Sequence, residues 1–300
     1  MGFFKKAEKG SYDLFSNYSH FVPGMGGLLM ILVMFLAGGL LANILQIGLI
    51  AISTEFANTY GQMLSYPLLF IPAMLYASAQ SRKNEIFDKG YALDSNNFSP
   101  LNGWKAGLLA AISTLALAFI VEPLMVFLPE MPLWFKDLME KMLTGTPFWV
   151  TLISVSVFAP IFEEWLCRGI ILRGLLSKMS PTGAITISAL FFAVIHLNPW
   201  QALPAFILGM WFGYVYYKTG SLKLTMLMHF ANNTMAACMG QIPELSEADS
   251  VMEIMPVWQF TSVYALAIIV FAIAALSFRK LELKGSGAGN CDEIPAIDAE

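Results

Sequence analysis

Long apolar runs are the feature that most limits the folds open to this chain. Of its 300 residues, 57% are hydrophobic and only 13% are charged, whereas about a quarter of the residues in a soluble domain are charged. An apolar run of about 17–25 residues is long enough to cross the hydrocarbon core of a bilayer as a helix. Such runs lie near residues 24–52, 60–79, 104–128, 148–172, 181–197, 200–217, 222–240 and 256–278.

These runs predict an all-α fold. Inside a bilayer every backbone N–H and C=O group must find a partner within the protein, and a helix satisfies its own groups. We therefore expect a polytopic membrane protein, a single bundle of about eight transmembrane helices. Its expected parts are a cytoplasmic N-terminal segment (1–23), N-terminal transmembrane helices (24–144), a core (145–240), an outer loop with the last transmembrane helix (241–280) and a disordered cytoplasmic tail (281–300).

The positions of Lys and Arg predict the orientation in the membrane, because cytoplasmic loops are enriched in these residues. With the N-terminus inside, the outer loops hold only Lys136 and Lys141, and the inner segments hold Lys5, Lys6, Lys9, Arg82, Lys83, Lys89, Lys105, Arg173, Lys178, Lys218, Lys223, Arg279, Lys280 and Lys284. Both termini are therefore expected in the cytoplasm. The outer segment MPLWFKDLMEKML (131–143) has the mixture of apolar and charged residues that is typical of a short helix in the membrane interface.

Composition also limits the partners. The net charge is only −4 and no basic block occurs, so the lipid bilayer is an expected partner and nucleic acid is not. The three cysteines, Cys167, Cys238 and Cys291, lack the spacing of a zinc site and indicate no disulfide framework.

A small group of polar residues inside the expected spans is the strongest functional signal. Ionisable side chains are costly in the membrane and by default indicate a function. Away from the span ends, this group consists of Glu163, Glu164, Arg168, His196 and His229, with Asn232 and Asn233 beside the last histidine. The chain has only 3 histidines, so two of them belong to this group.

Helical spacing gives the members of this group different surroundings. Glu164 and Arg168 are four residues apart, in the favoured acid-before-base order, and can form a buried ion pair. Glu163 points about 100° away from Glu164 and lacks that partner, so it is a candidate general base. Phe192 and His196 share a helix face, as do His229 and Asn233. Glu163 and His196 are each roughly 20 Å, at 1.5 Å per residue, from the turn KMSP (178–181) that joins their helices.

Structural explanations compete with functional ones. A buried Glu–Arg pair is often purely structural, and Glu164 with Arg168 fits either explanation equally well. A single histidine in the membrane is commonly just a hydrogen-bonding group, but two histidines and a spare glutamate on three helices favour a site. Glu122, which precedes Pro123 near an outer helix end, is interpreted as structural or interfacial.

Three motifs in this region resemble a known family. EEWLCR has the form EExxxR, FAVIH has the form FxxxH, and HFANN contains HxxxN. Over about residues 145–240 they occur in the order found in the CPBP family of intramembrane proteases. This family includes the CAAX prenyl endopeptidase Rce1 and the bacterial Abi bacteriocin-immunity proteins. The resemblance implies that residues 145–240 form the catalytic core.

The resemblance also implies roles for the residues. Glu163 would be the general base that activates water, and His196 would help to hold it. His229 and Asn233 would stabilise the oxyanion, Glu164 and Arg168 would orient and support the site, and Phe192 would pack. Zinc is an open alternative, with Glu163, His196 and His229 as its ligands. The chain contains no HExxH motif, so the sequence leaves the metal and the glutamate mechanisms open.

Three functions follow as hypotheses. The first is an intramembrane endopeptidase acting on a peptide or membrane protein, either a prenylated CAAX protein or a bacterial polypeptide. The second is a proton-coupled transporter that uses Glu163 and the histidines as a relay. The third is a bacteriocin-immunity protein that works by binding. For the protease we expect Glu163, His196, His229 and Asn233 to converge on one cavity, open to the cytoplasmic side or laterally, with Glu164 turned toward Arg168.

Overall fold

A computed structural model describes Tyr18 and residues 20–84, 94–242, 244 and 250–281. The described residues form helices without any strand, which confirms the all-α prediction. The α-helices are α1 (Met25–Ile52), α2 (Thr54–Ser65), α3 (Ile71–Asn84), α4 (Gly103–Val121), α5 (Leu133–Thr144), α6 (Phe148–Thr151), α7 (Ala159–Glu164), α8 (Arg173–Leu176), α9 (Pro181–Val194), α10 (Pro199–Thr219), α11 (Leu222–Met239), α13 (Val251–Ile254) and α14 (Val257–Arg279). Two 3₁₀ turns, η2 (Tyr66–Leu69) and η3 (Glu122–Phe127), and two π-helical stretches, η4 (Leu152–Phe158) and η5 (Trp165–Leu172), complete them.

The protein is a multi-pass integral membrane protein. In the described part of the chain, 4 helical segments are long and apolar enough to cross a membrane: Met25–Ile52, Gly103–Phe127, Phe148–Leu176 and Val257–Arg279. The other predicted spans are also helical, but Pro181–Val194 is shorter and the segment from α2 to α3 is broken by η2. A count of eight crossings therefore stays a prediction.

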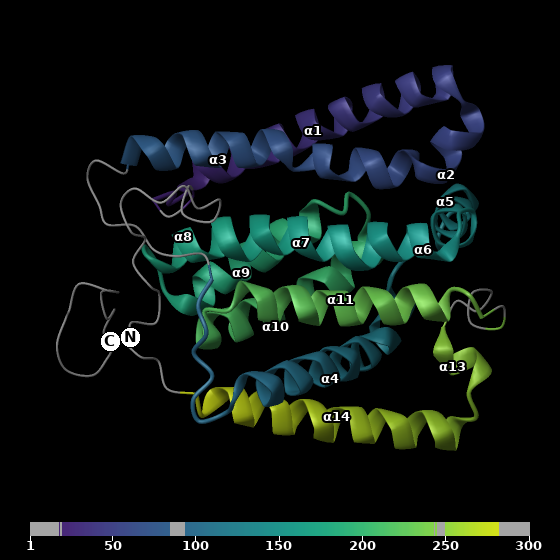
Figure 1. The fold of residues 1–300 in the computed structure, drawn as a ribbon. Helices are drawn as coiled ribbons and strands as arrows, with labels where there is room; N and C mark the ends of the chain where they lie inside the picture. The colour runs from purple at the N-terminus through teal and green to yellow at the C-terminus, as the bar shows by residue number, and fades with distance from the viewer. Residues whose placement is uncertain (1–17, 19, 85–93, 243, 245–249, 282–300) are drawn as a thin grey trace.

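The long helices lie side by side in three groups (Figure 1). Helices α1, α2 and α3 pack on one another along one edge, and α4 and α14 pack together along the opposite edge. The segment from α6 to α8 lies between these edges, with α9, α10 and α11 packed around it. The motif-bearing helices therefore occupy the middle of the bundle, where most of the buried side chains are found.

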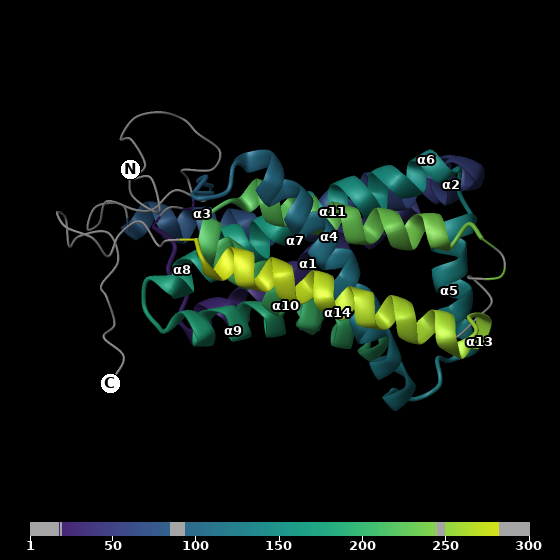
Figure 2. The same cartoon turned by 90° about the horizontal axis from the view of Figure 1, so that it is seen from below.

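The long helical segments, with α2 and α3 as one segment and α6 to α8 as another, run back and forth between two ends of the bundle (Figures 1 and 2). The end where α3, α8 and α14 finish carries the described basic residues Arg82, Lys83, Lys105, Arg173, Lys178, Lys218, Lys223, Arg279 and Lys280. Helix α5, with Lys136 and Lys141, lies at the opposite end. The sequence predicts this gathering of Lys and Arg at one end. That this end faces the cytoplasm stays a prediction.

Helix α5 forms where an interfacial helix is expected, but its apolar residues point in two directions. Phe135 is buried and packs against Trp200, with 5.0 Å between ring centroids. Leu133, Trp134 and Leu138 are exposed. One side of α5 therefore faces the protein, and the other presents large apolar side chains outward, as an interfacial helix does.

The helix that carries Glu163 and Glu164 is irregular on both sides of them. The short α-helical stretch α7 contains Pro160 and both glutamates, and π-helical stretches precede and follow it. Pro160 lacks the N–H group that a regular helix needs, and π-helical turns occur frequently at functional sites. The apolar sequence of this span indicates a helix but not its π-helical geometry.

A glycine allows α10 to pack against this central helix. A Cβ atom at Gly209 would lie 3.1 Å from Nη2 of Arg168 and 3.2 Å from both Ala189 and Phe192. The missing side chain thus lets the α10 backbone approach Arg168 closely, and this approach shapes the wall of the candidate site.

Candidate active site

Glu164 and Arg168 form the ion pair that their spacing predicts. Nη1 of Arg168 donates to Oε1 of Glu164 over 2.9 Å, and both side chains are fully buried. Nη2 of Arg168 donates to the carbonyl oxygen of Gly209, also over 2.9 Å. The guanidinium lies over the rings of Phe192 and Phe212, at 4.5 and 5.3 Å from their centroids. Pairing, hydrogen bonds and cation–π contacts together compensate the cost of burying this charge.

Glu164 also orients His229, a contact that the sequence does not reveal. Oε1 of Glu164 lies 3.0 Å from Nδ1 of His229. A carboxylate accepts hydrogen bonds, so this contact places a proton on Nδ1. The other ring nitrogen, Nε2, then points to Glu163, and its distance to Oε2 of Glu163 is 3.9 Å.

The two carboxylate oxygens of Glu163 have different surroundings. Oε1 accepts a hydrogen bond from the hydroxyl of Tyr66 in η2. Oε2 is buried and accepts no hydrogen bond from any described residue. A gap of 3.9 Å is too long for a direct hydrogen bond, but a single water molecule in contact with both Oε2 and Nε2 of His229 can fill it.

His196 lies beside this pair, fixed by its own helix. Its Nδ1 is 2.7 Å from the carbonyl oxygen of Phe192, so Nε2 is the nitrogen left for other partners. The ring of Phe192 packs edge-on against His196 and His229, with centroid distances of 5.1 and 5.5 Å. The hydrogen bond to Glu163 comes from Tyr66. No direct contact of His196 with Glu163 supports the expectation that His196 helps to hold this glutamate.

Asn233 is anchored on the opposite wall. Its Nδ2 donates to the carbonyl oxygen of Val155 in the π-helical stretch η4, over 2.8 Å. Its Oδ1 accepts a hydrogen bond from Nδ2 of Asn232 over 3.1 Å. The amide group has two N–H bonds, so one donor remains after the contact with Val155.

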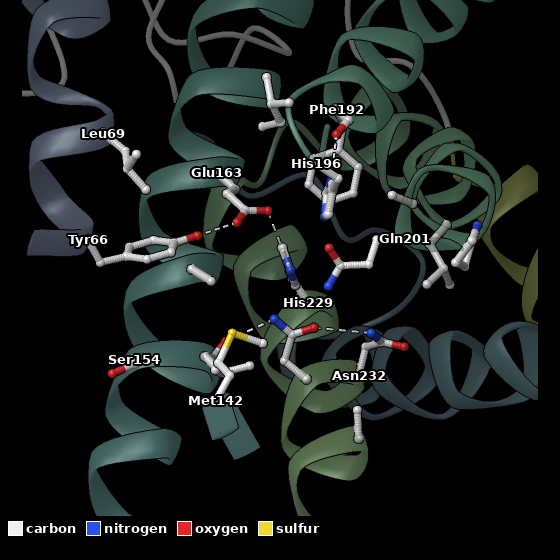
Figure 3. A pocket seen from close by; sticks show the side chains of 18 of the residues that line it. Tyr66, Leu69, Met142, Ser154, Glu163, Phe192, His196, Gln201, His229 and Asn232 are labelled. Atoms are coloured by element: carbon white, nitrogen blue, oxygen red, sulfur yellow. Dashed lines mark hydrogen bonds and ion pairs between the residues drawn. The ribbon is translucent and has the colours of Figure 1, made fainter. Parts of the chain in front are cut away.

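Glu163, His196, His229 and Asn233 line one cavity of about 450 Å³ (Figure 3). They come from α7, the end of α9 and α11, so three helices that are separate in sequence meet at one place. Figure 3 shows Glu163 between Tyr66 and His229, with the amide group of Gln201 pointing toward the two histidines. The rest of the wall is mostly apolar and includes Phe35, Phe70, Met139 and Met142.

The cavity extends toward the end of the bundle where α5 lies. Its wall includes Met139 and Met142 of α5, and α5 lies opposite the basic end. Among the described residues, no Lys or Arg lines it. These lining residues show which end of the bundle the wall reaches, and the expected opening to the cytoplasmic side or laterally stays a prediction. Positively charged loops report on topology, and they do not determine where a helix bundle leaves space.

The sequence does not single out four polar residues of the cavity wall, Gln62, Tyr66, Ser154 and Gln201, of which Tyr66 and Gln201 lie nearest to the proposed catalytic groups in Figure 3. Tyr66 lies inside the expected span 60–79, and only the following Pro67 hints at the turn that directs its side chain. Gln201 follows the helix start at Pro199 and Asn198, and its Oε1 accepts a hydrogen bond from Nδ2 of Asn198 over 2.6 Å. An uncharged polar residue near a helix start is a weak signal, because most such residues are capping or interfacial groups.

The proposed zinc ligands do not form a compact metal site. Among the described residues, no three His, Cys, Asp or Glu side chains lie close enough together to hold a metal ion. The pairing of Nδ1 of His229 with Glu164 is a contact that zinc-binding histidines also make. Glu163 directs one oxygen to Tyr66 and keeps the other free, so it is the spacing of the three side chains that does not fit a two-His-one-Glu site.

Residues 145–235 match the family described as type II CAAX prenyl endopeptidase Rce1-like. No curated protein and no solved structure matches this chain. The matched segment contains all three motifs, but it does not include Phe35, Tyr66, Phe70, Met139 and Met142 of the cavity wall. The resemblance that the motifs indicate is thus confirmed over residues 145–235, which are similar to the Rce1-like endopeptidases.

Proposed function

We propose that this protein is an intramembrane endopeptidase in which Glu163 activates a water molecule. The observation that carries the proposal is the pair formed by the unpartnered Oε2 of Glu163 and Nε2 of His229, 3.9 Å apart and facing one cavity. The similarity to an endopeptidase family supports the same reaction class.

In the proposed reaction, Oε2 of Glu163 accepts a proton from water while the water oxygen attacks the carbonyl carbon of the scissile peptide bond. The carbonyl oxygen becomes an oxyanion, which accepts hydrogen bonds from the free N–H of Asn233 and from Nε2 of His229 in its protonated form. Glu163 then transfers its proton to the leaving nitrogen. The C–N bond breaks, and a new carboxyl group and a new amino group result.

The surrounding residues support these two roles. The carboxylate of Glu164 lies beside His229 and compensates for a positive charge on the imidazole. Arg168 in turn holds the carboxylate of Glu164 in place. Phe192 and Phe212 cover the ring of His229 and limit the water that reaches it. Only the cavity side of the imidazole is left for a substrate.

The substrate of the proposed protease is a peptide or a membrane protein. The description of the family names CAAX prenyl proteins as the substrates of its members, and a prenylated C-terminus is one class to be tested. A bacterial peptide or an unmodified membrane segment is the other. The mostly apolar wall of the cavity suits a segment that reaches the site from the membrane.

Comparison of membrane-protein and peptide termini in cells that produce the wild type or Glu163→Gln tests the proposal. The substitution keeps the side-chain volume and removes the base, so we expect termini that are present with the wild type and absent with the variant. A proton-coupled transporter or an immunity protein that acts by binding generates no such termini. Identical sets of termini in the two cell populations contradict the proposal.

A further inference from the structure

Tyr66 contacts the proposed base from outside the part of the chain that matches the endopeptidase family. It lies in η2, between α2 and α3, and is 97 residues away from Glu163 in sequence. Its hydroxyl donates to Oε1 of Glu163 and its side chain lines the cavity. The matched segment begins at residue 145, so this hydrogen bond joins the N-terminal helices to the motif EExxxR.

The contact fixes the direction of a flexible side chain. A glutamate has three rotatable bonds, and Glu164 already takes up the donors of Arg168 and His229 that are within reach. With Oε1 bound to Tyr66, Oε2 is the oxygen that faces Nε2 of His229. One oxygen of Glu163 is therefore held in place, and the other is left to accept a proton.

The turn that carries Tyr66 is held by close packing against α1. A Cβ atom at Gly38 of α1 would overlap the main-chain carbonyl group of Leu69 and would lie 2.6 Å from the carbonyl oxygen of Leu68. Only glycine lets α1 approach the turn η2 this closely. Two other glycines of α1 have room for a side chain. A Cβ atom at Gly39 would meet a side chain only at 3.8 Å, and one at Gly48 would meet nothing within 4 Å.

Aromatic packing continues the connection to the central helix. Phe70 is almost fully buried and packs against Phe35 of α1, with 5.4 Å between ring centroids. On other sides Phe70 packs against Tyr66 and stacks on Phe162, each with a centroid distance of 5.6 Å. Phe162 precedes Glu163, so α1, η2 and α7 form one packed unit around the carboxylate.

We propose that Tyr66 is a positioning residue for the carboxylate of Glu163 and that Gly38 permits the packing that holds Tyr66 in place. Helices α1, α2 and α3 would then be part of the catalytic unit and more than a membrane anchor. This inference rests on the proposed endopeptidase function. It adds to the residues 145–235 two positions that the family match does not cover.

The test uses the full-length protein in proteoliposomes and a quenched-fluorescent peptide whose sequence spans a Glu163-dependent cleavage site found in cells. Tyr66→Phe removes one hydroxyl group and keeps the ring. A hydrogen bond to a charged group is among the stronger ones in proteins, so we expect kcat to fall about 10- to 100-fold. KM should stay within about twofold, because the cavity shape and the ring packing remain. The thermal midpoint should fall by only a few degrees, as expected for the loss of one hydrogen bond.

Matched variants separate this role from a structural one. Tyr60→Phe removes a hydroxyl from a tyrosine that packs against Phe56 and Trp149, and it should leave kcat unchanged. Gly38→Ala should lower kcat, and Gly48→Ala should not.

Three outcomes test the positioning role of Tyr66 and the endopeptidase function separately. A kcat within about twofold of the wild type in Tyr66→Phe, or a loss explained by a higher KM or a much lower thermal midpoint, overturns the positioning role and leaves the endopeptidase proposal intact. Cleavage of the peptide by Glu163→Gln at the wild-type rate overturns the proposed function itself. A selective loss of kcat in Tyr66→Phe, with Tyr60→Phe unaffected, supports the inference.

Discussion

Arg168 contacts three parts of the candidate site, and its guanidinium forms an ion pair with the carboxylate of Glu164. It bonds to Glu164 and to the carbonyl oxygen of Gly209, and it lies over the rings of Phe192 and Phe212. Through Glu164 it is also connected to His229. Loss of the guanidinium therefore affects both the stability of the bundle and the direction of a proposed catalytic group.

We expect Arg168→Ala to reduce the free energy of unfolding by about 3–5 kcal/mol, because Glu164 is left charged and buried without its partner. The measurement is thermal or denaturant unfolding of the purified protein in detergent. The double variant Glu164→Gln, Arg168→Met removes both charges and should be more stable than Arg168→Ala. A single variant as stable as the wild type would show that the pair does not hold the helices together.

Asn233 is proposed to donate to the oxyanion, so its loss should slow the chemical step. Loss of one oxyanion donor typically costs about 10²- to 10³-fold in kcat, and we expect Asn233→Ala to lie in this range with KM little changed. Steady-state cleavage of a peptide substrate provides the measurement. Glu55→Gln, at an exposed position of α2, is the control. An Asn233→Ala protein with wild-type kcat would remove Asn233 from the mechanism.

A glutamate-driven mechanism predicts that cleavage survives the removal of metal ions. Dialysis against a strong chelator, followed by assay in chelated buffer, should leave kcat unchanged, since no step above needs a metal. Metal analysis of the dialysed protein by mass spectrometry is the control. Loss of activity that is restored by added zinc would favour the alternative in which Glu163, His196 and His229 are ligands.

At the scale of single residues, the sequence predicts contacts within one helix and the meeting of the motif residues at one cavity, but it misses the individual contacts between helices. Glu164 and Arg168 are four residues apart on one helix, and helical geometry alone brings them together. The contacts of Glu164 with His229 and of Glu163 with Tyr66 join residues 65 and 97 positions apart. Such pairs depend on how the helices pack, and spacing carries no information about them.

The helical elements themselves follow closely from the apolar runs, while their irregularities do not. Every predicted span corresponds to helix in the structure. The turn η2 and the π-helical stretches η4 and η5 are not predicted. A run of apolar residues indicates a helix, but it does not show which hydrogen-bonding pattern the helix has. These irregular stretches supply Tyr66 and the carbonyl oxygen of Val155 to the site.

Close packing of α10 on the central helix makes Gly209 sensitive to substitution. We expect Gly209→Val to destabilise the protein by about 1–3 kcal/mol through overpacking, because even a Cβ atom there would crowd Arg168, Ala189 and Phe192. Unfolding of the purified variant is the measurement. Gly48→Val, in an open position of α1, should have a small effect. Equal stability of the two variants would argue against tight packing at Gly209.

At the scale of the whole molecule, the basic end and the cavity lie toward opposite ends of the bundle. The sequence predicts that the basic residues gather at one end, but it does not predict that the wall of the cavity reaches toward the other end. If the basic end faces the cytoplasm, as the excess of Lys and Arg predicts, the cavity extends toward the outer side of the membrane. The substrate would then approach from that side or from the outer half of the bilayer.

Cysteine labelling in intact cells tests this orientation. In a background without native cysteines, Lys141→Cys in α5 should react with a membrane-impermeant maleimide. Lys223→Cys, at a side chain that is 80% exposed on the basic end, should react only after the cells are permeabilised. The reverse pattern would place the cavity on the cytoplasmic side and contradict the predicted topology.

The most direct test of the central claim is the rate at which the purified protein cleaves a membrane-reconstituted substrate, measured for the wild type, Glu163→Gln and Glu55→Gln. Glu163→Gln keeps the shape of the site and removes the proton acceptor, so it should lose at least about 10²-fold in kcat, within the range given by general base catalysis. Glu55→Gln should cleave like the wild type. A Glu163→Gln protein that is folded and turns over substrate at the wild-type rate would contradict the claim that Glu163 activates the water.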